Sequence, residues 1–225
     1  MQTTFSLLLL LAIDGLPEVE GGEAARHRRL ITAGLLTALQ AANDLGLTPA
    51  DPEAEALLLY RPGPVPAPVQ VLAQARRLFE TFHHWITDFQ RSQPCGCLTC
   101  RTVTGLNLRI VAHAGPVAFA TGQGPYGDAL RLLYDLLVDK ASAHEHVLLT
   151  DALLGAEREA AGFWAGARRG SFSAGQLGDV GYVSVVLRDP NEPFPYPPAS
   201  PIERSFFNPY WPLELPGLPD RLALN

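Results

Sequence analysis

Residues 4–13, a run closed by Asp14 and Gly15, form the feature that most constrains the fold of this chain. The run is apolar without interruption from Leu7 to Ile13. A strand with one solvent-facing side alternates polar and apolar residues, whereas a strand covered on both faces is continuously apolar. The run is too short to cross a bilayer, which takes about 20 helical residues, and no Lys or Arg precedes Leu7 to start a signal peptide. We therefore predict the central strand of a sheet.

The composition indicates one folded domain with a distinct tail. Of the 225 residues, 47% are hydrophobic and 18% are charged, and the formal net charge is −6. This apolar content suffices for a core, and the negative charge disfavours a nucleic-acid-binding surface. We expect a domain over residues 1–188 and an arm over residues 189–225, with no nucleic-acid partner and no membrane attachment.

The arm combines dense prolines with aromatic residues, among them Phe206, Tyr210 and Trp211. Proline favours the extended polyproline conformation, and segments that stay disordered normally lack aromatic residues. We interpret residues 189–225 as an extended arm that packs on its own domain or on a neighbouring chain. A disordered tail is the alternative.

Hydrophobic periodicity predicts alternating helices and strands along the domain. Elements in this order give an α/β sandwich of the ferredoxin-like kind, with helices on one face of the sheet and the first strand in its middle. We interpret the Gly- and Ala-rich residues 155–178 as a helix end and a surface loop. The predicted helices are 22–45, 69–90, 126–138 and 151–164, and the predicted strands are 54–60, 105–115 with 117–120 as hairpin partner, 146–150 and 181–187.

Several short motifs occur in the order found in one known family. Residues 12–17, Ala-Ile-Asp-Gly-Leu-Pro, resemble the metal motif of class III adenylate and guanylate cyclase domains, normally Asp-Ile-x-Gly-Phe-Thr. Residues 53–57 resemble the family's Gly-Asp hairpin strand, residues 108–117 resemble its Leu-Arg-Ile-Gly-x-x-x-Gly-x-Val strand, and Tyr126-Gly127 matches the start of its helix. The chain is most similar to an uncharacterised bacterial branch of cyclase-like domains that carries a cysteine cluster after the long helix. The resemblance implies the cyclase type of central sheet.

On the strand side, the resemblance implies that the paired metal-binding carboxylates are lost. Cyclisation of a nucleoside triphosphate needs two metal ions and two carboxylates to hold them. The first carboxylate position is Ala12, and we expect Asp14 to point away from it because the chain turns at Gly15. Glu55 stands at the second position. One carboxylate of the pair makes a poor two-metal site.

On the helix side, the resemblance implies that the ribose-positioning Asn and the phosphate-neutralising Arg are replaced by Arg131 and Asp135. An Asp beside a triphosphate repels it, so this change opposes the reaction. The base-reading Lys and Asp of adenylate cyclases align with Asp51 and Gly124. We therefore predict a degenerate, non-catalytic cleft, formed by Ala12, Asp14, Glu55, Arg131 and Asp135.

The three cysteines lie together as Cys95, Cys97 and Cys100 after the long predicted helix. Three thiolates at this spacing can wrap one tetrahedral Zn²⁺ in a tight loop, as a structural site. Packed or reactive thiols are the alternative. With no export signal and no disulfide framework, we expect a reducing, cytoplasmic compartment.

A zinc ion at this cluster needs a fourth ligand from elsewhere in the chain. His83 and His84 are nearest in sequence, and His113 is a candidate in space. A histidine within a strand such as His113 is more typically a hydrogen-bonded core residue than a ligand. For His144 and His146, beside Glu145, we favour a surface position.

These observations predict a non-catalytic cyclase-like domain that serves as a ligand-binding or protein-interaction module for an unknown protein or small molecule. Two alternatives stay open. One is an active nucleotidyl cyclase or transferase with a rearranged site, and the other is a thiol or zinc sensor. We also expect a homodimer, because cyclase domains pair across the face that carries their active site.

Overall fold

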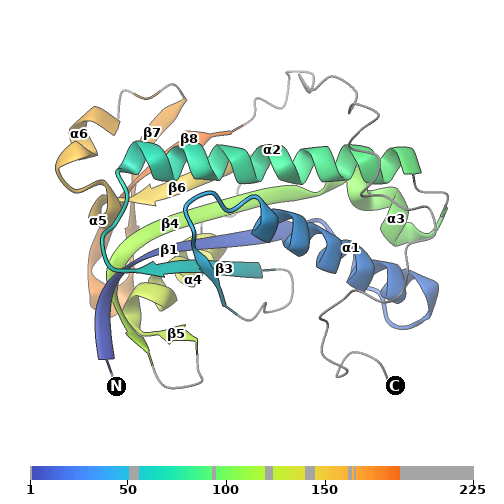
Figure 1. Ribbon diagram of the computed structural model, residues 1–225, viewed down its shortest axis with the longest axis horizontal. Coiled ribbons are helices and arrows are strands. Elements are labelled where there is room, and N and C mark those ends of the chain that lie inside the picture. The colour runs from blue at the N-terminus through green and yellow to red at the C-terminus, as the bar shows by residue number, and fades with distance from the viewer. Residues whose placement is uncertain are drawn as a thin grey trace.

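The computed structural model describes residues 2–50, 56–92, 95–119, 124–139, 145–161, 164 and 166–187. These residues form one mixed sheet with helices against both faces (Figure 1). The predicted arm, residues 189–225, lies outside the described residues, as do Glu55, Asp51 and His144. None of the described helices is long and apolar enough to cross a membrane.

The sheet has the strand order β2-β3-β1-β4-β6-β8-β7, with β5 paired to β4. β4 and β6 run parallel, and the other described pairs are antiparallel. β1 lies between β3 and β4, which confirms the prediction of an interior strand. The strands are β1 (Gln2–Asp14), β2 (Thr48–Pro49), β3 (Ala56–Pro62), β4 (Asn107–Phe119), β5 (Pro125–Tyr126), β6 (His146–Thr150), β7 (Ala167–Ser173) and β8 (Asp179–Val186).

Longer helices flank the sheet, and short helical turns connect its strands. In Figure 1 the two longest helices, α1 and α2, lie in front of the sheet and α4 lies behind it. The helices are α1 (Gly22–Ala41), α2 (Pro68–Ser92), α3 (Leu98–Thr102), α4 (Asp128–Asp139), α5 (Asp151–Leu154) and α6 (Arg158–Ala161), with 3-10 turns η1 (Val103–Gly105), η2 (Gly155–Glu157) and η3 (Gly175–Leu177).

The apolar run of β1 contributes to two separate cores. Leu7, Leu9 and Leu11 pack with α1 and α2 on one face, while Leu8 and Leu10 pack with α4 on the other. Successive side chains of a strand point to opposite faces, so a run buried on both sides must be apolar throughout. Burying each leucine fully contributes roughly 1.5–3 kcal/mol. The expectation of helices on one face only was wrong, because α4 covers the second.

The predicted long amphipathic helix is α2, which also fixes the end of α1. Its buried Gln74 accepts hydrogen bonds from the backbone N–H groups of Asp44 (2.8 Å) and Leu45 (3.1 Å). The Gln74 amide also donates to the carbonyl of Ala42 (2.9 Å). These bonds satisfy backbone groups that the end of a helix leaves without partners. α1 therefore ends at Ala41, a little before the predicted limit.

The larger differences from the prediction concern β4, the predicted helix 151–164 and the predicted surface loop. β4 continues to Phe119 instead of turning back after Gly115, because the first residues of β1 pair with residues 117–119. The predicted helix 151–164 is interrupted at Gly155, whose φ of 52° does not fit a right-handed helix. The predicted surface loop contains a strand, β7, which pairs only with β8 among the described strands. An edge strand can be polar and glycine-containing, and so it lacks the apolar pattern of a buried strand.

Candidate functional site

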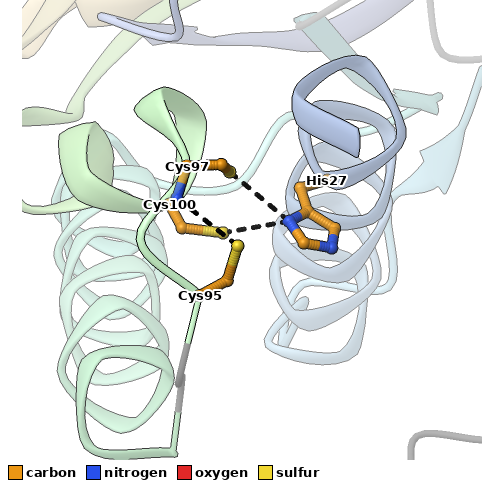
Figure 2. Close-up of side chains that lie close together, drawn as sticks. All are labelled: His27, Cys95, Cys97 and Cys100. Carbon is orange, nitrogen blue, oxygen red and sulfur yellow. Dashed lines mark hydrogen bonds between the residues drawn. The ribbon is translucent and has the colours of Figure 1, made fainter. Parts of the chain in front are cut away.

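Four potential metal ligands converge where α1, α3 and the loop before α3 meet. Cys95 and Cys97 come from the loop, Cys100 from α3 and His27 from α1. One ligand atom from each residue lies within 4.8 Å of the others. Figure 2 shows the His27 ring pointing at the cysteine sulfurs. The predicted cysteine cluster is therefore brought together, with a histidine added from a distant segment.

Local hydrogen bonds hold the cysteine loop against α1. The backbone N–H of Cys97 donates to Cys95 Sγ (3.4 Å), which curls the loop around its first sulfur. The backbone N–H of Arg101 donates to the Cys97 carbonyl and starts α3 (3.1 Å). The fully buried Thr99 donates its hydroxyl to the Ala24 carbonyl of α1 (3.0 Å). These bonds position the cluster independently of any ion.

Nδ1 of His27 is the ring atom that faces the thiols. It lies 3.3 Å from Cys100 Sγ and 3.5 Å from Cys97 Sγ (Figure 2). Nε2 of the same ring lies 4.0 Å from a carboxylate oxygen of Glu23, one helical turn earlier. That oxygen is also 4.0 Å from Cys95 Sγ.

The surroundings of the thiols change their acidity in opposite directions. For Cys97, burial alone would raise the pKa, but hydrogen bonds from the Cys100 backbone and from His27 and the other thiols lower it to about 7. Burial, together with the neighbouring Cys97 and Cys95 sulfurs, raises the pKa of Cys100 to about 12. A cluster without a cation thus holds one readily ionised thiol beside one that resists ionisation.

The sequence-based candidates for the fourth ligand take other roles. His83 is buried, and its Nε2 lies 2.8 and 2.9 Å from the carboxylate oxygens of Glu145. His84 is exposed on α2 and does not belong to the four-residue group. His113 Nδ1 is hydrogen-bonded to Thr150 Oγ1 (2.9 Å), which confirms the interpretation as a core residue, and burial lowers its pKa to about 4.

The predicted surface position of His146 was wrong, and neighbouring Glu145 is buried with it. Glu145 lies beneath α2, where its carboxylate contacts His83 Nε2, and His146 is the first residue of β6. The backbone N–H of Leu187 donates to the Glu145 carbonyl (3.0 Å). His27 was missed because a histidine among arginines on a helix resembles a solvated surface residue. Its position one helical turn after Glu23 was the only signal.

At the end of β1, the residues of the predicted degenerate cleft have specific partners. Ala12 is only 7% exposed and belongs to the apolar core under α4. Asp14 forms a two-pronged ion pair with Arg109, whose Nη2 lies 2.8 Å from Oδ1 and whose Nε bonds Oδ2. Nη1 of Arg109 donates to the Leu137 carbonyl of α4. The expectation that Asp14 points away from Ala12 was wrong, because β1 continues through Asp14 and two residues along a strand restore the same face.

Arg131 and Asp135, predicted to face the cleft, pair with each other on α4. Arg131 Nε lies 3.7 Å from Asp135 Oδ2, and their side chains are 77% and 45% exposed. Gly124, before β5, is exposed, and a side chain there would approach Ala50. Whether these residues and Glu55 form a site together stays a prediction.

Comparison with known proteins bears on the fold more than on the site. Residues 32–126 match a family model described as a protein of unknown function, DUF2652. This range contains the three cysteines and excludes His27. A search of curated proteins finds no match.

Solved structures of cyclases are similar in three dimensions. The adenylyl cyclase CyaB from P. aeruginosa has 10% identity and a TM-score of 0.55, covering 85% of this chain and 98% of that chain. An adenylate/guanylate cyclase/hydrolase from Silicibacter pomeroyi has 11% identity and a TM-score of 0.52, covering 83% and 98%. The guanylate cyclase domain of RhGC from Catenaria anguillulae, solved with GTP, has 14% identity and a TM-score of 0.51, covering 84% and 100%.

The chain has the fold of a class III cyclase catalytic domain. At these identities the similarity concerns the fold alone, and chemistry must be argued from the residues. The predicted fold class is thereby confirmed. The arrangement of β1 between β3 and β4 places the Asp14–Arg109 pair at the end of the central strands, and the cysteine–histidine cluster lies on the helical layer that covers the opposite face.

Proposed function

We propose that this chain is a non-catalytic domain of the cyclase fold that acts as a ligand-binding or protein-interaction module. The observation that carries the proposal is the Asp14–Arg109 ion pair beside the buried Ala12. A guanidinium that engages both carboxylate oxygens occupies the lone pairs that a divalent cation would use. Arg109 itself is tied to α4 through the Leu137 carbonyl. A metal-dependent reaction at this strand end would first have to displace an internal cation.

The electrostatics of α4 support the same proposal. Arg131 is paired with Asp135, so its charge is partly neutralised within one turn of the helix. A phosphoryl-transfer site instead aims cations at the charge that develops on the phosphate. Exposed pairs of this kind are weak, at about 0.3–0.5 kcal/mol. The Arg131–Asp135 pair therefore supports the proposal less strongly than the Asp14–Arg109 pair does.

The test is turnover and binding of nucleotides. We expect purified full-length protein with Mg²⁺ or Mn²⁺ to form no cyclic or pyrophosphate product from any common nucleoside triphosphate. We also expect calorimetry to detect no micromolar, metal-dependent binding of ATP or GTP. An active cyclase domain assayed in parallel serves as the positive control.

The enzymatic alternative, a cyclase or transferase with a rearranged site, predicts the opposite result. Sustained turnover that is abolished by Glu55→Ala, and retained by the matched change Glu20→Ala at an exposed position of the β1–α1 loop, would overturn the non-catalytic proposal. Turnover that persists in Glu55→Ala, Asp14→Ala and Arg131→Ala would come from a contaminating enzyme. The non-catalytic proposal for this chain would then stand.

A structural zinc ion at Cys95, Cys97 and Cys100 is part of the proposed function, together with a reducing, cytoplasmic location that keeps these thiols free. The convergence of the cysteines supports it. A thiol or zinc sensor is the second candidate, because Cys95 and Cys97 remain partly accessible to solvent. A metal-free protein with inert thiols would remove the support for a sensor.

We further propose a homodimer in which the strand end beside Ala12 is covered, with residues 189–225 contributing. The partly exposed Asp14 carboxylate at this strand end is already paired with Arg109, which makes it less costly to bury than an unpaired charge. Light scattering on the full chain and on a chain ending at Asp189 tests this. A monomer in both cases at high concentration would contradict the dimer, and a dimer that survives truncation would assign the contact to the domain.

A further inference from the structure

We propose that His27 completes a closed tetrahedral Zn²⁺ site with Cys95, Cys97 and Cys100, coordinating through Nδ1. This assignment rests on the zinc role proposed above. It specifies the fourth ligand and assigns the ion a structural role. The four ligand atoms lie within 4.8 Å of one another and come from separate segments of the chain. Four protein ligands around a tetrahedral ion leave no position for a substrate, so the ion is structural.

The orientation of the His27 ring identifies the ligating atom. Nδ1 faces Cys97 and Cys100 (Figure 2). Nε2 lies 4.0 Å from a carboxylate oxygen of Glu23. An imidazole that binds a metal through Nδ1 carries its remaining proton on Nε2. Glu23 is largely exposed and lies beyond hydrogen-bond distance of Nε2, so its contribution to the zinc affinity is modest.

The donor set selects the metal. Three thiolates and one imidazole suit Zn²⁺, whereas Mg²⁺ and Ca²⁺ require oxygen ligands. The backbone N–H of Cys97 donates a hydrogen bond to Cys95 Sγ, which fixes the position of this sulfur in the loop.

The ion would reinforce the contact between α1 and α3, which the Thr99–Ala24 hydrogen bond already joins. His27 lies near the start of α1, and Cys100 lies in α3, which leads through η1 directly into β4. Gly15, in the turn after β1, has a φ of 98°, and a Cβ there would lie 3.1 Å from the Gly105 carbonyl oxygen. The β1–α1 turn and the η1–β4 junction are thus already in close contact. Zinc would add a further link between the start of α1 and the segment that leads into β4.

Metal content and ligand type test the site directly. We expect freshly purified full-length protein to contain one zinc per chain by elemental mass spectrometry. X-ray absorption should show sulfur neighbours at about 2.3 Å and a nitrogen neighbour at about 2.0–2.1 Å in a three-to-one ratio. A metal-free protein that also fails to bind Zn²⁺ under reducing conditions would overturn the proposal.

Substitutions at position 27 separate the fourth ligand from mere neighbours. We expect His27→Cys to keep one zinc with four sulfur neighbours. His27→Ala should lose more zinc affinity than the 10–100-fold typical of changes outside the ligand shell. His84→Ala, at an exposed histidine of α2 outside the cluster, is the matched control and should leave the affinity unchanged.

Two outcomes contradict the assignment even if zinc is present. An unchanged nitrogen neighbour in His27→Ala would place the fourth ligand elsewhere, and unchanged zinc affinity would exclude His27 as a ligand. The His27→Cys variant is the control for a folding defect. With zinc bound, it should have the same melting temperature as the unaltered protein. None of these readouts involves nucleotide, so a catalytic result would overturn the non-catalytic proposal while leaving the zinc site intact.

Discussion

Replacing Glu145 by alanine is expected to lower the free energy of unfolding by about 3 kcal/mol, because it leaves two buried hydrogen-bonding groups without their partner, at roughly 1–3 kcal/mol each. The Glu145 carboxylate accepts from the Leu108 backbone N–H (3.0 Å) and lies against His83 Nε2 (2.8 and 2.9 Å). Alanine removes both interactions in the interior, where lost partners are not replaced by water. Urea denaturation at neutral pH provides the measurement.

The matched control for Glu145 is the exposed pair on α4. Asp135→Ala breaks the Arg131–Asp135 contact at the surface, and we expect a change of about 0.3–0.5 kcal/mol at most. Equal effects of the two substitutions would show that the contacts of Glu145 with His83 of α2 and Leu108 of β4 do not stabilise the fold. Glu145→Gln, which keeps an acceptor for the Leu108 N–H, should lose less stability than Glu145→Ala.

Acidification is expected to destabilise the fold through His113, by about 3 kcal/mol once the pH approaches 4. Burial lowers the pKa of His113 to about 4, whereas the pKa of a histidine in an unfolded chain is about 6.5. Between these two values the unfolded chain binds the proton and the folded chain does not. Stability is therefore fully present above about pH 6.5 and is lost as the pH falls toward 4.

The His113→Gln variant isolates this contribution. It keeps a polar side chain near Thr150 but cannot take up a proton, so its unfolding free energy should fall less steeply between pH 6.5 and pH 4 than that of the unaltered protein. His84→Gln, at an exposed position, should retain the original slope. Acid also protonates zinc ligands and so releases zinc, but both variants and the unaltered protein lose zinc in the same way. Identical pH profiles for His113→Gln and the unaltered protein would contradict the assignment to His113.

The sequence sufficed where a pattern is local and long. The uninterrupted apolar run from Leu7 to Ile13 determined a strand covered on both faces, because any polar residue there would be buried without a partner. The amphipathic period over α2 determined a long helix for the same reason. The order of these elements was enough to expect a ferredoxin-like sandwich, and the resemblance of short motifs implied the cyclase type of sheet.

Edges and ends were less predictable. β7 escaped prediction because an edge strand needs no continuous apolar face, and its ladder depends on β8 as partner. The continuation of β4 past Gly115 likewise depends on the first residues of β1, which are distant in sequence. In both cases the hydrogen bonds that define the strand are made with another segment of the chain.

For the candidate sites, the sequence by itself determined which chemical groups are present: three closely spaced thiols, and an alanine at the position where the resemblance to cyclases implies a carboxylate. Only the tertiary structure decided their partners. It places His27 of α1 beside the thiols, and it places His83 in contact with Glu145 and not with the cysteines. It also turned Asp14 toward Arg109. Coordination and ion pairing act over a few ångströms of space regardless of separation along the chain, so they follow from packing and not from spacing.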